Sequence, residues 1–282
     1  MAAPSFEERL RGVVGITRPI NAIVAGVLTF IGAFVATDAF LTPASMAAVV
    51  ATILATGAGN TINDYFDREI DRINAPDRPI PSGTVTPREA LLISGVLFAV
   101  AIVVALVWLP RLAILVAVLN LIALIAYTPV FKARPAAGNL VVAYLGGSTF
   151  LFGGLAVGNP GPTLVLSVLA VLSTMTREIV KDIEDMAGDE AEGLDTLPLR
   201  IGAERSLWIG IALLVVALVA SPLPYLVGIF GPVYLGLVAI ADALFVYAGY
   251  RSFSDPTAGQ TYLKYGMFLS AGAFILGRLA VL

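Results

Sequence analysis

The sequence predicts an all-α membrane protein whose chain crosses the bilayer many times. Of its 282 residues, 58% are hydrophobic and 13% are charged, and the mean hydropathy is +0.91. Soluble domains contain about half apolar and about a quarter charged residues. The apolar residues also occur in stretches of about 20, the length that a helix needs to cross a bilayer. We therefore expect one transmembrane domain over residues 1–282.

Nine candidate membrane spans follow one another along the chain. They cover residues 16–37, 43–66, 88–109, 111–130, 138–157, 162–183, 205–222, 229–250 and 261–281. Breaks with turn chemistry separate them, for example Leu109-Pro110 and Ser221-Pro222. Counts of eight or ten spans are the alternatives.

The basic residues are segregated by this arrangement. If the N-terminus is cytoplasmic, all of the 17 Lys and Arg residues except Arg111 and Arg278 fall on the cytoplasmic side. Such a bias sets the orientation of membrane proteins, and a missed span would scramble it. We expect a multi-pass protein of the cell membrane, with its N-terminus in the cytoplasm and its C-terminus outside.

The absence of two residue types restricts the chemistry. The chain has no Cys and no His, so thiolate and imidazole ligands and the usual general base are missing. Any metal must therefore be a hard ion with oxygen ligands, which points to Mg²⁺.

Two acid-rich segments, about 67–88 and 177–205, lie on the predicted cytoplasmic side. A copy of the pattern D-x-x-D-x-x-x-D accompanies each segment, at residues 64–71 and 182–189. On a helix the three aspartates of one copy share one face. The predicted catalytic and metal-binding residues are Asp64, Asp67, Asp71, Asp182, Asp185 and Asp189, with Asn60 and Asn63 as further metal ligands.

Three carboxylates on one helical face repel each other, so a cation must neutralise them. One explanation is a solvated helix end whose acids pair with Arg68, Arg72 and Lys181. The identical spacing in two segments on one side favours two or more Mg²⁺ ions shared with a bridging diphosphate. We expect the active site here, facing the cytoplasm.

Other polar residues are candidates for binding substrates, since basic groups can stabilise a leaving diphosphate. The set comprises Asn21, Arg72, Arg78, Tyr127, Lys132, Arg134, Arg177, Lys181 and Arg200. Lys132 and Arg134 lie in a separate loop and are candidates for a phosphate on the acceptor. The alternative for each basic residue is simple anchoring at the membrane surface. Tyr127 could stabilise a carbocation with its ring or merely pack.

At these residues the chain resembles the UbiA superfamily of intramembrane prenyltransferases. The resemblance covers nearly the whole chain and rests on four motifs. These are Arg18-Pro19-x-Asn21, Asn63-Asp64-x-x-Asp67-x-x-x-Asp71 with Arg78-Pro79 after it, Tyr127-Thr128-Pro129, and Asp182-x-x-Asp185-x-x-x-Asp189. It implies nine helices around a central cavity, a cap formed by loops 2–3 and 6–7, and Mg²⁺-dependent binding of a polyprenyl diphosphate. Asn74-Ala75-Pro76 departs from the family pattern, in which a second basic residue precedes the proline.

Within the superfamily, the two acidic motifs most resemble archaeal digeranylgeranylglyceryl phosphate synthases. That family transfers a geranylgeranyl group from geranylgeranyl diphosphate to the hydroxyl of geranylgeranylglyceryl phosphate in ether-lipid biosynthesis. An aromatic prenyltransferase of quinone biosynthesis, with 4-hydroxybenzoate or naphthoate as acceptor, is the alternative. A cation transporter would need carboxylates near the bilayer midplane, and a CDP-alcohol phosphotransferase would need a D-G-x-x-A-R motif. We expect the lipid bilayer as surroundings, no nucleic acid and no obligate protein partner.

Overall fold

The computed structural model describes residues 5–282. All of the secondary structure in this range is helical, as predicted. The elements are α1 (Phe6–Ile16), α2 (Pro19–Ala36), α3 (Pro43–Asn74), α4 (Pro87–Trp108), α5 (Arg111–Ala126), the π-helix η1 (Tyr127–Phe131), α6 (Ala137–Ala156), α7 (Gly161–Ala191), α8 (Leu197–Ile201), α9 (Ala203–Ala220), α10 (Leu223–Leu226), α11 (Pro232–Ser252) and α12 (Pro256–Leu279).

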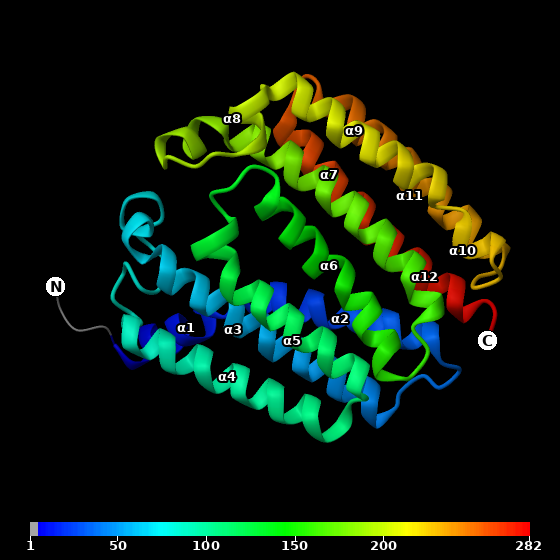
Figure 1. The fold of residues 1–282 in the computed structure, drawn as a ribbon, viewed down its shortest axis with the longest axis horizontal. Helices are drawn as coiled ribbons and strands as arrows, with labels where there is room; N and C mark the ends of the chain where they lie inside the picture. Colours follow the sequence, from blue (N-terminus) through cyan, green and yellow to red (C-terminus); the bar gives the residue numbers. More distant parts are fainter. Residues whose placement is uncertain (1–4) are drawn as a thin grey trace.

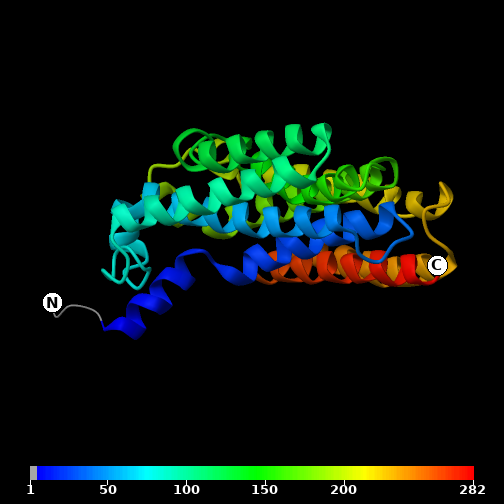
Figure 2. The same ribbon diagram turned by 90° about the horizontal axis from the view of Figure 1, so that it is seen from below.

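The long helices lie side by side and share one long axis (Figure 1). Seen from below, α1 leaves the bundle at an angle, whereas α2 continues along it (Figure 2). α1 lies at one end of the bundle, and α12 finishes at the opposite end.

Eight helices within residues 5–282 are long and apolar enough to cross a membrane. Each coincides with one of the first eight predicted spans. The ninth prediction, 261–281, coincides with α12, which is 24 residues long but is not among the eight. Lys264 and Arg278 interrupt its apolar sequence. The count of nine spans therefore stays a prediction.

The two acid-bearing helices are longer than the sequence predicted. α3 continues from the predicted end at residue 66 to Asn74, and α7 continues from 183 to Ala191. Residues that we expected in loops therefore extend the helices for about two turns each. All six aspartates of the two motifs are therefore helical, and their spacing places the three of each motif on one helical face.

Prolines and caps define most of the helix boundaries. Pro19 occupies the first turn of α2, where its missing N–H costs nothing. The residue before it, Arg18, has a φ of 48°, a left-handed conformation that is uncommon for residues other than glycine. Thr42 and Thr86 cap α3 and α4 with capping boxes. The short helices α1, α8 and α10 were not predicted.

The bundle is held together by close helix packing away from the aspartates. One buried cluster joins α2, α6, α7, α11 and α12 through residues such as Ile31, Phe150, Leu166, Tyr234 and Phe274. α2 and α6 cross at glycines: a Cβ on Gly153 would collide with backbone atoms of Thr29 and Ala33. Small residues at such crossings permit backbone contact in membrane bundles.

Candidate active site

A cavity of about 1030 Å³ occupies the middle of the bundle. Within residues 5–282, every helix of 16 or more residues contributes side chains to its wall: α2, α3, α4, α5, α6, α7, α9, α11 and α12. Ligand pockets in proteins typically enclose roughly 300–1,000 Å³, so this cavity is at the large end of the range. Its volume suits a long chain or two ligands at once.

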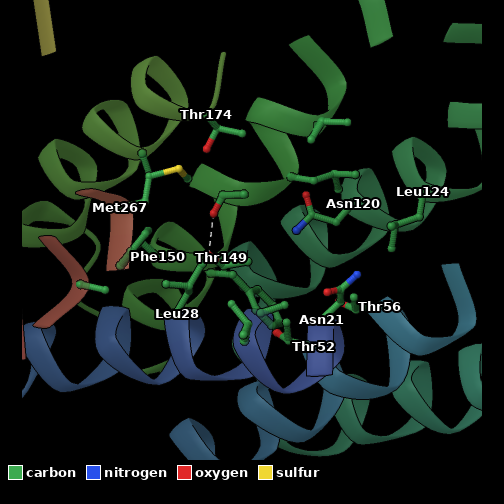
Figure 3. A pocket seen from close by; sticks show the side chains of 18 of the residues that line it. Asn21, Leu28, Thr52, Thr56, Asn120, Leu124, Thr149, Phe150, Thr174 and Met267 are labelled. Atoms are coloured by element: carbon green, nitrogen blue, oxygen red, sulfur yellow. Dashed lines mark hydrogen bonds between the residues drawn. The ribbon is translucent and has the colours of Figure 1, made fainter. Parts of the chain in front are cut away.

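The wall of the cavity is mostly apolar. Basic and amide side chains gather toward one end, and Asp242, which accepts a hydrogen bond from Ser221, lies in the wall away from that end. Leu28, Phe150 and Met267 belong to the apolar part of the wall, and the amides of Asn21 and Asn120 also line the cavity (Figure 3). The polar end contains Arg18, Asn60, Asn63, Tyr127, Arg177, Glu178 and Lys181. A ligand with an apolar tail and a charged head would match this distribution.

The first aspartate cluster, on α3, divides between two sets of partners. Asp64 and Asp71 are buried, with 4% and 5% exposure, and both face cations. The Arg18 guanidinium donates to Asp64, and Arg78 donates to both oxygens of Asp71 at 2.7 Å. Arg78 also lies 3.8 Å from Asp64. The two arginines and two aspartates therefore form one ion-pair network.

Arg78 lies in the segment after α3, outside the spanning helices. Burial of its guanidinium opposes the charge, but the hydrogen bond and the negative field of Asp71, with those of Asp64 and Asp67, raise its pKa above the ordinary value. Arg78 therefore keeps its charge throughout the pH range in which proteins function.

Asn63 and Asp67 contact residues in and beside η1. The Lys132 ammonium lies 2.9 Å from Asp67 Oδ2, and the Thr128 hydroxyl donates to Asn63 Oδ1 at 3.0 Å. η1 contains Pro129, which has no N–H to donate, and Lys132 N bonds to Tyr127 O five residues back. The wide turn places the Thr128 and Lys132 side chains against α3.

The second cluster, on α7, is also held by polar partners. Asn139 of α6 donates to Asp182 at 2.8 Å, and Lys181 donates to Asp185 at 2.9 Å. One turn earlier, Arg177 donates to Glu178 at 2.7 Å and to Gln260 of α12 at 3.1 Å. The last contact ties the cluster to the C-terminal helix.

The two acid-rich segments meet in space. The Asn74 amide at the end of α3 donates to Glu192 at the end of α7, with 2.5 Å between the atoms. The backbone N–H of Asp195 bonds to the Ala133 carbonyl at 3.4 Å. The segments after α3, η1 and α7 thus contact each other, and their role as a cap over the cavity stays a prediction.

The donor set of this region consists of hard oxygen ligands, as Mg²⁺ requires. Within residues 5–282, no three acidic side chains gather closely enough to hold a metal ion by themselves. Mg²⁺ commonly takes only one or two carboxylates and fills the other positions with substrate phosphate oxygens and water. The separated aspartates at the mouth of the cavity fit that mode of binding.

Only some of the predicted substrate-binding residues line the cavity. Asn21, Tyr127, Arg177 and Lys181 line the cavity, as do the predicted metal ligands Asn60 and Asn63. The six aspartates and Arg78 lie beyond its polar end, and Lys132 is held by Asp67. Arg72 pairs with Glu69, Arg200 lies 3.9 Å from Asp195, and Arg134 is exposed; these three do not line the cavity.

Several residues of the site were missed in the sequence. Arg18 belongs to a motif that the resemblance used, but its pairing with Asp64 depends on the approach of α2 to α3. Asn139 and Gln260 contact the second cluster from α6 and α12. The signal that could have found them is their polarity within apolar segments, since polar groups in a membrane need partners.

The chain is similar to curated proteins over almost its whole length. It is 60% identical over 276 residues to a digeranylgeranylglyceryl phosphate synthase of Natronomonas pharaonis, with 97% of this chain and 99% of the relative covered. It is 56% identical to the synthase of the same name from Halobacterium salinarum, with 95% and 98% covered.

Solved structures share the fold. A structure of digeranylgeranylglyceryl phosphate synthase, 38% identical, matches with a TM-score of 0.85 and covers 97% of this chain and 99% of its own. A UbiA homolog from Archaeoglobus fulgidus bound to DMAPP and Mg²⁺, 17% identical, matches with a TM-score of 0.68 and coverages of 92% and 99%. Residues 25–272 match the UbiA prenyltransferase family. This chain, a multi-pass helical membrane protein, belongs to the UbiA prenyltransferase family.

Proposed function

We propose that this protein transfers the geranylgeranyl group of geranylgeranyl diphosphate to the hydroxyl of geranylgeranylglyceryl phosphate and releases diphosphate. Relatives that share 60% and 56% of their residues with it carry the name of that synthase. The structural observation that carries the proposal is the cavity of about 1030 Å³, which is apolar along most of its wall and has Arg18, Arg177 and Lys181 at the end nearest the aspartates.

The donor would lie along the cavity with its diphosphate at the polar end. There the residues that would hold Mg²⁺ are the aspartates of α3 and α7, with Asn60 and Asn63 nearby. When bound, Mg²⁺ neutralises charge on the diphosphate and so makes it a better leaving group. Archaeoglobus homologs of the same fold bind Mg²⁺ together with DMAPP or GPP.

The basic residues of the site would stabilise the leaving diphosphate. Arg78, Lys132 and Lys181 each hold an aspartate at 2.7–2.9 Å, so they already lie beside the carboxylates that the diphosphate would approach. A guanidinium and two ammonium groups fixed in this way can receive the charge that develops as the bond to carbon breaks. Arg177 and Lys181 also line the cavity itself.

The reaction exchanges one carbon–oxygen bond for another. The bond between the first prenyl carbon and the diphosphate breaks, with the electron pair leaving on oxygen, and the acceptor hydroxyl oxygen bonds to that carbon. The hydroxyl proton passes to the diphosphate. Apolar walls contributed by side chains such as Leu124, Leu169 and Phe274 would exclude water, which would otherwise capture the allylic cation.

The same proposal includes the orientation in the membrane. With nine crossings, the first and last helices would begin and end on opposite sides of the bilayer. The positions of α1 and of the end of α12 in Figure 1 agree with this. The basic residues then put the polar end of the cavity, with its aspartates, at the cytoplasmic side.

The test uses the purified protein in lipid nanodiscs with radiolabelled geranylgeranyl diphosphate and Mg²⁺. Geranylgeranylglyceryl phosphate and 4-hydroxybenzoate are supplied in parallel reactions. The proposal predicts label in the phosphoglycerol lipid. Label only in the benzoate would assign the protein to aromatic prenylation, and transfer to neither acceptor would contradict the proposal.

A further inference from the structure

Lys264 differs from the other two lysines of the chain. Lys132 and Lys181 each form an ion pair at 2.9 Å. Lys264, on α12, is exposed, lines the cavity and has no carboxylate within 4.0 Å among residues 5–282. A lysine that lines a largely apolar cavity without a protein counter-ion can pair with an anionic ligand.

The depth of Lys264 follows from the contact between α7 and α12. Gln260 is one turn before Lys264 and accepts a hydrogen bond from Arg177. A rise of about 1.5 Å per residue puts the Lys264 backbone roughly 6 Å farther along α12 than Gln260, away from the aspartates. Asp182 lies roughly 7 Å from Arg177 in the opposite direction. The Lys264 backbone therefore lies farther from the aspartates than the contact between Gln260 and Arg177.

The cavity reaches the lipid-facing surface beside Lys264. Ile20 of α2 and Phe268 of α12 line the cavity and are nevertheless 76% and 49% exposed. Tyr265, the residue after Lys264, is 50% exposed. α2 and α12 run beside each other, as Figure 2 shows, so Lys264 lies at a lateral edge of the cavity.

Anchoring at the membrane surface explains Lys264 less well. The basic residues near the ends of α11 and α12, Arg251 and Arg278, each pair with an aspartate, Asp255 at 3.0 Å and Asp38 at 2.6 Å. Both lie in the last turn of their helices. Lys264 lies more than two turns inside α12. The cavity wall beside it is mostly apolar.

We propose that Lys264 binds the phosphate monoester of the lipid acceptor; this rests on the proposed function. The acceptor's hydroxyl is separated from its phosphate by only the glycerol carbons. A phosphate held at Lys264 would direct that hydroxyl toward the donor carbon below the aspartates. It would also keep the two phosphate groups apart, with Arg177 between them. The sequence had suggested Lys132 and Arg134, but neither lines the cavity.

The experiment compares wild type, Lys264→Gln and Lys264→Arg in nanodiscs, with geranylgeranylglyceryl phosphate and its dephosphorylated analogue, geranylgeranylglycerol, as acceptors. Arg205→Gln is the matched control, since Arg205 is an exposed basic residue on α9 that does not line the cavity. Each reaction is run in neutral phosphatidylcholine and in bilayers that contain anionic phosphatidylglycerol.

Loss of one charge-assisted contact should raise the KM for the phosphorylated acceptor about tenfold or more in Lys264→Gln. The KM for the donor and the KM for geranylgeranylglycerol should not change, and Lys264→Arg should retain most of the affinity. An equal effect on both acceptors, or an effect seen only with phosphatidylglycerol, would overturn the inference by making Lys264 a structural or bulk-lipid contact. An unchanged KM in Lys264→Gln would also overturn it. Failure of wild type to use either glycerol lipid would instead contradict the proposed function.

Discussion

Arg18, in a left-handed conformation at the start of α2, forms an ion pair with the carboxylate of Asp64, which is buried in α3. Arg78 approaches the same carboxylate at 3.8 Å and holds Asp71 at 2.7 Å. This network joins the first spanning helix to the helix that carries the first aspartate motif. It fixes one wall of the polar end of the cavity.

Removal of Arg18 should therefore destabilise the protein. Arg18→Gln leaves Asp64 buried with the more distant Arg78, and we expect a loss of about 1–3 kcal/mol, less than for a fully buried pair because Arg18 is partly exposed. The measurement is thermal unfolding in detergent of Arg18→Gln, Asp64→Asn and the double variant. The double variant should be more stable than the sum of the single losses predicts. Strictly additive losses would show that the two side chains do not stabilise each other.

Asp67 and Asp182 are the aspartates whose replacement should affect transfer with the least effect on folding. Each has one protein partner, Lys132 or Asn139. Asp67→Asn and Asp182→Asn should each lower kcat by at least about a hundredfold, the scale of losing one electrostatic contact in a transition state. Their melting temperatures should stay near that of wild type. Asp38→Asn, at the opposite end of the bundle, is the control and should retain activity. Near-normal turnover in both site variants would exclude these carboxylates from the reaction.

The crossing of α2 and α6 should tolerate no added methyl group. In Gly153→Ala the new Cβ would meet backbone atoms of Thr29 and Ala33, which cannot move independently. We expect destabilisation of about 1–3 kcal/mol or more, as for overpacked cores. Gly95→Ala on α4 is the matched control, because a Cβ there meets nothing within 4 Å. Thermal unfolding compares the two, and equal stability would mean that α2 and α6 are not in backbone contact.

The deep part of the cavity should set the length of the donor chain. Ala271 of α12 lines the cavity about two turns beyond Lys264, on the side away from the aspartates. Ala271→Phe should occupy space that the end of a long prenyl chain needs. We expect kcat/KM to fall for geranylgeranyl diphosphate and to be retained for dimethylallyl diphosphate, measured with the same acceptor. A uniform loss for both donors would contradict this placement of the chain.

Much of the fold could be predicted because bilayer thickness limits helix length and prolines separate the helices. The pattern D-x-x-D-x-x-x-D similarly predicted a shared helical face, and α3 and α7 confirm that both copies are helical. The lengths of these two helices were underestimated. The hydropathy pattern marks where a helix leaves the membrane, whereas α3 continues to Asn74 beyond that point.

Pairings between distant residues could not be predicted in the same way. Asn139 donating to Asp182 and Arg18 pairing with Asp64 depend on which helices are neighbours, and charge and spacing along the chain do not contain that information. Lys264 was counted only among the basic residues of the cytoplasmic side for the same reason. Only the arrangement of α2, α7 and α12 places it on the cavity wall.

The most direct test of the central claim is photolabelling of the cavity with a geranylgeranyl diphosphate analogue that carries a photoreactive group at the far end of its chain. After irradiation in nanodiscs with Mg²⁺, the labelled residues are mapped by mass spectrometry. If the prenyl chain extends from the aspartates into the bundle, label should appear on cavity residues such as Ala271 and Phe274, and excess unlabelled donor should prevent it. Label confined to lipid-facing residues such as Val103 and Val219, or label that the donor does not displace, would contradict the account.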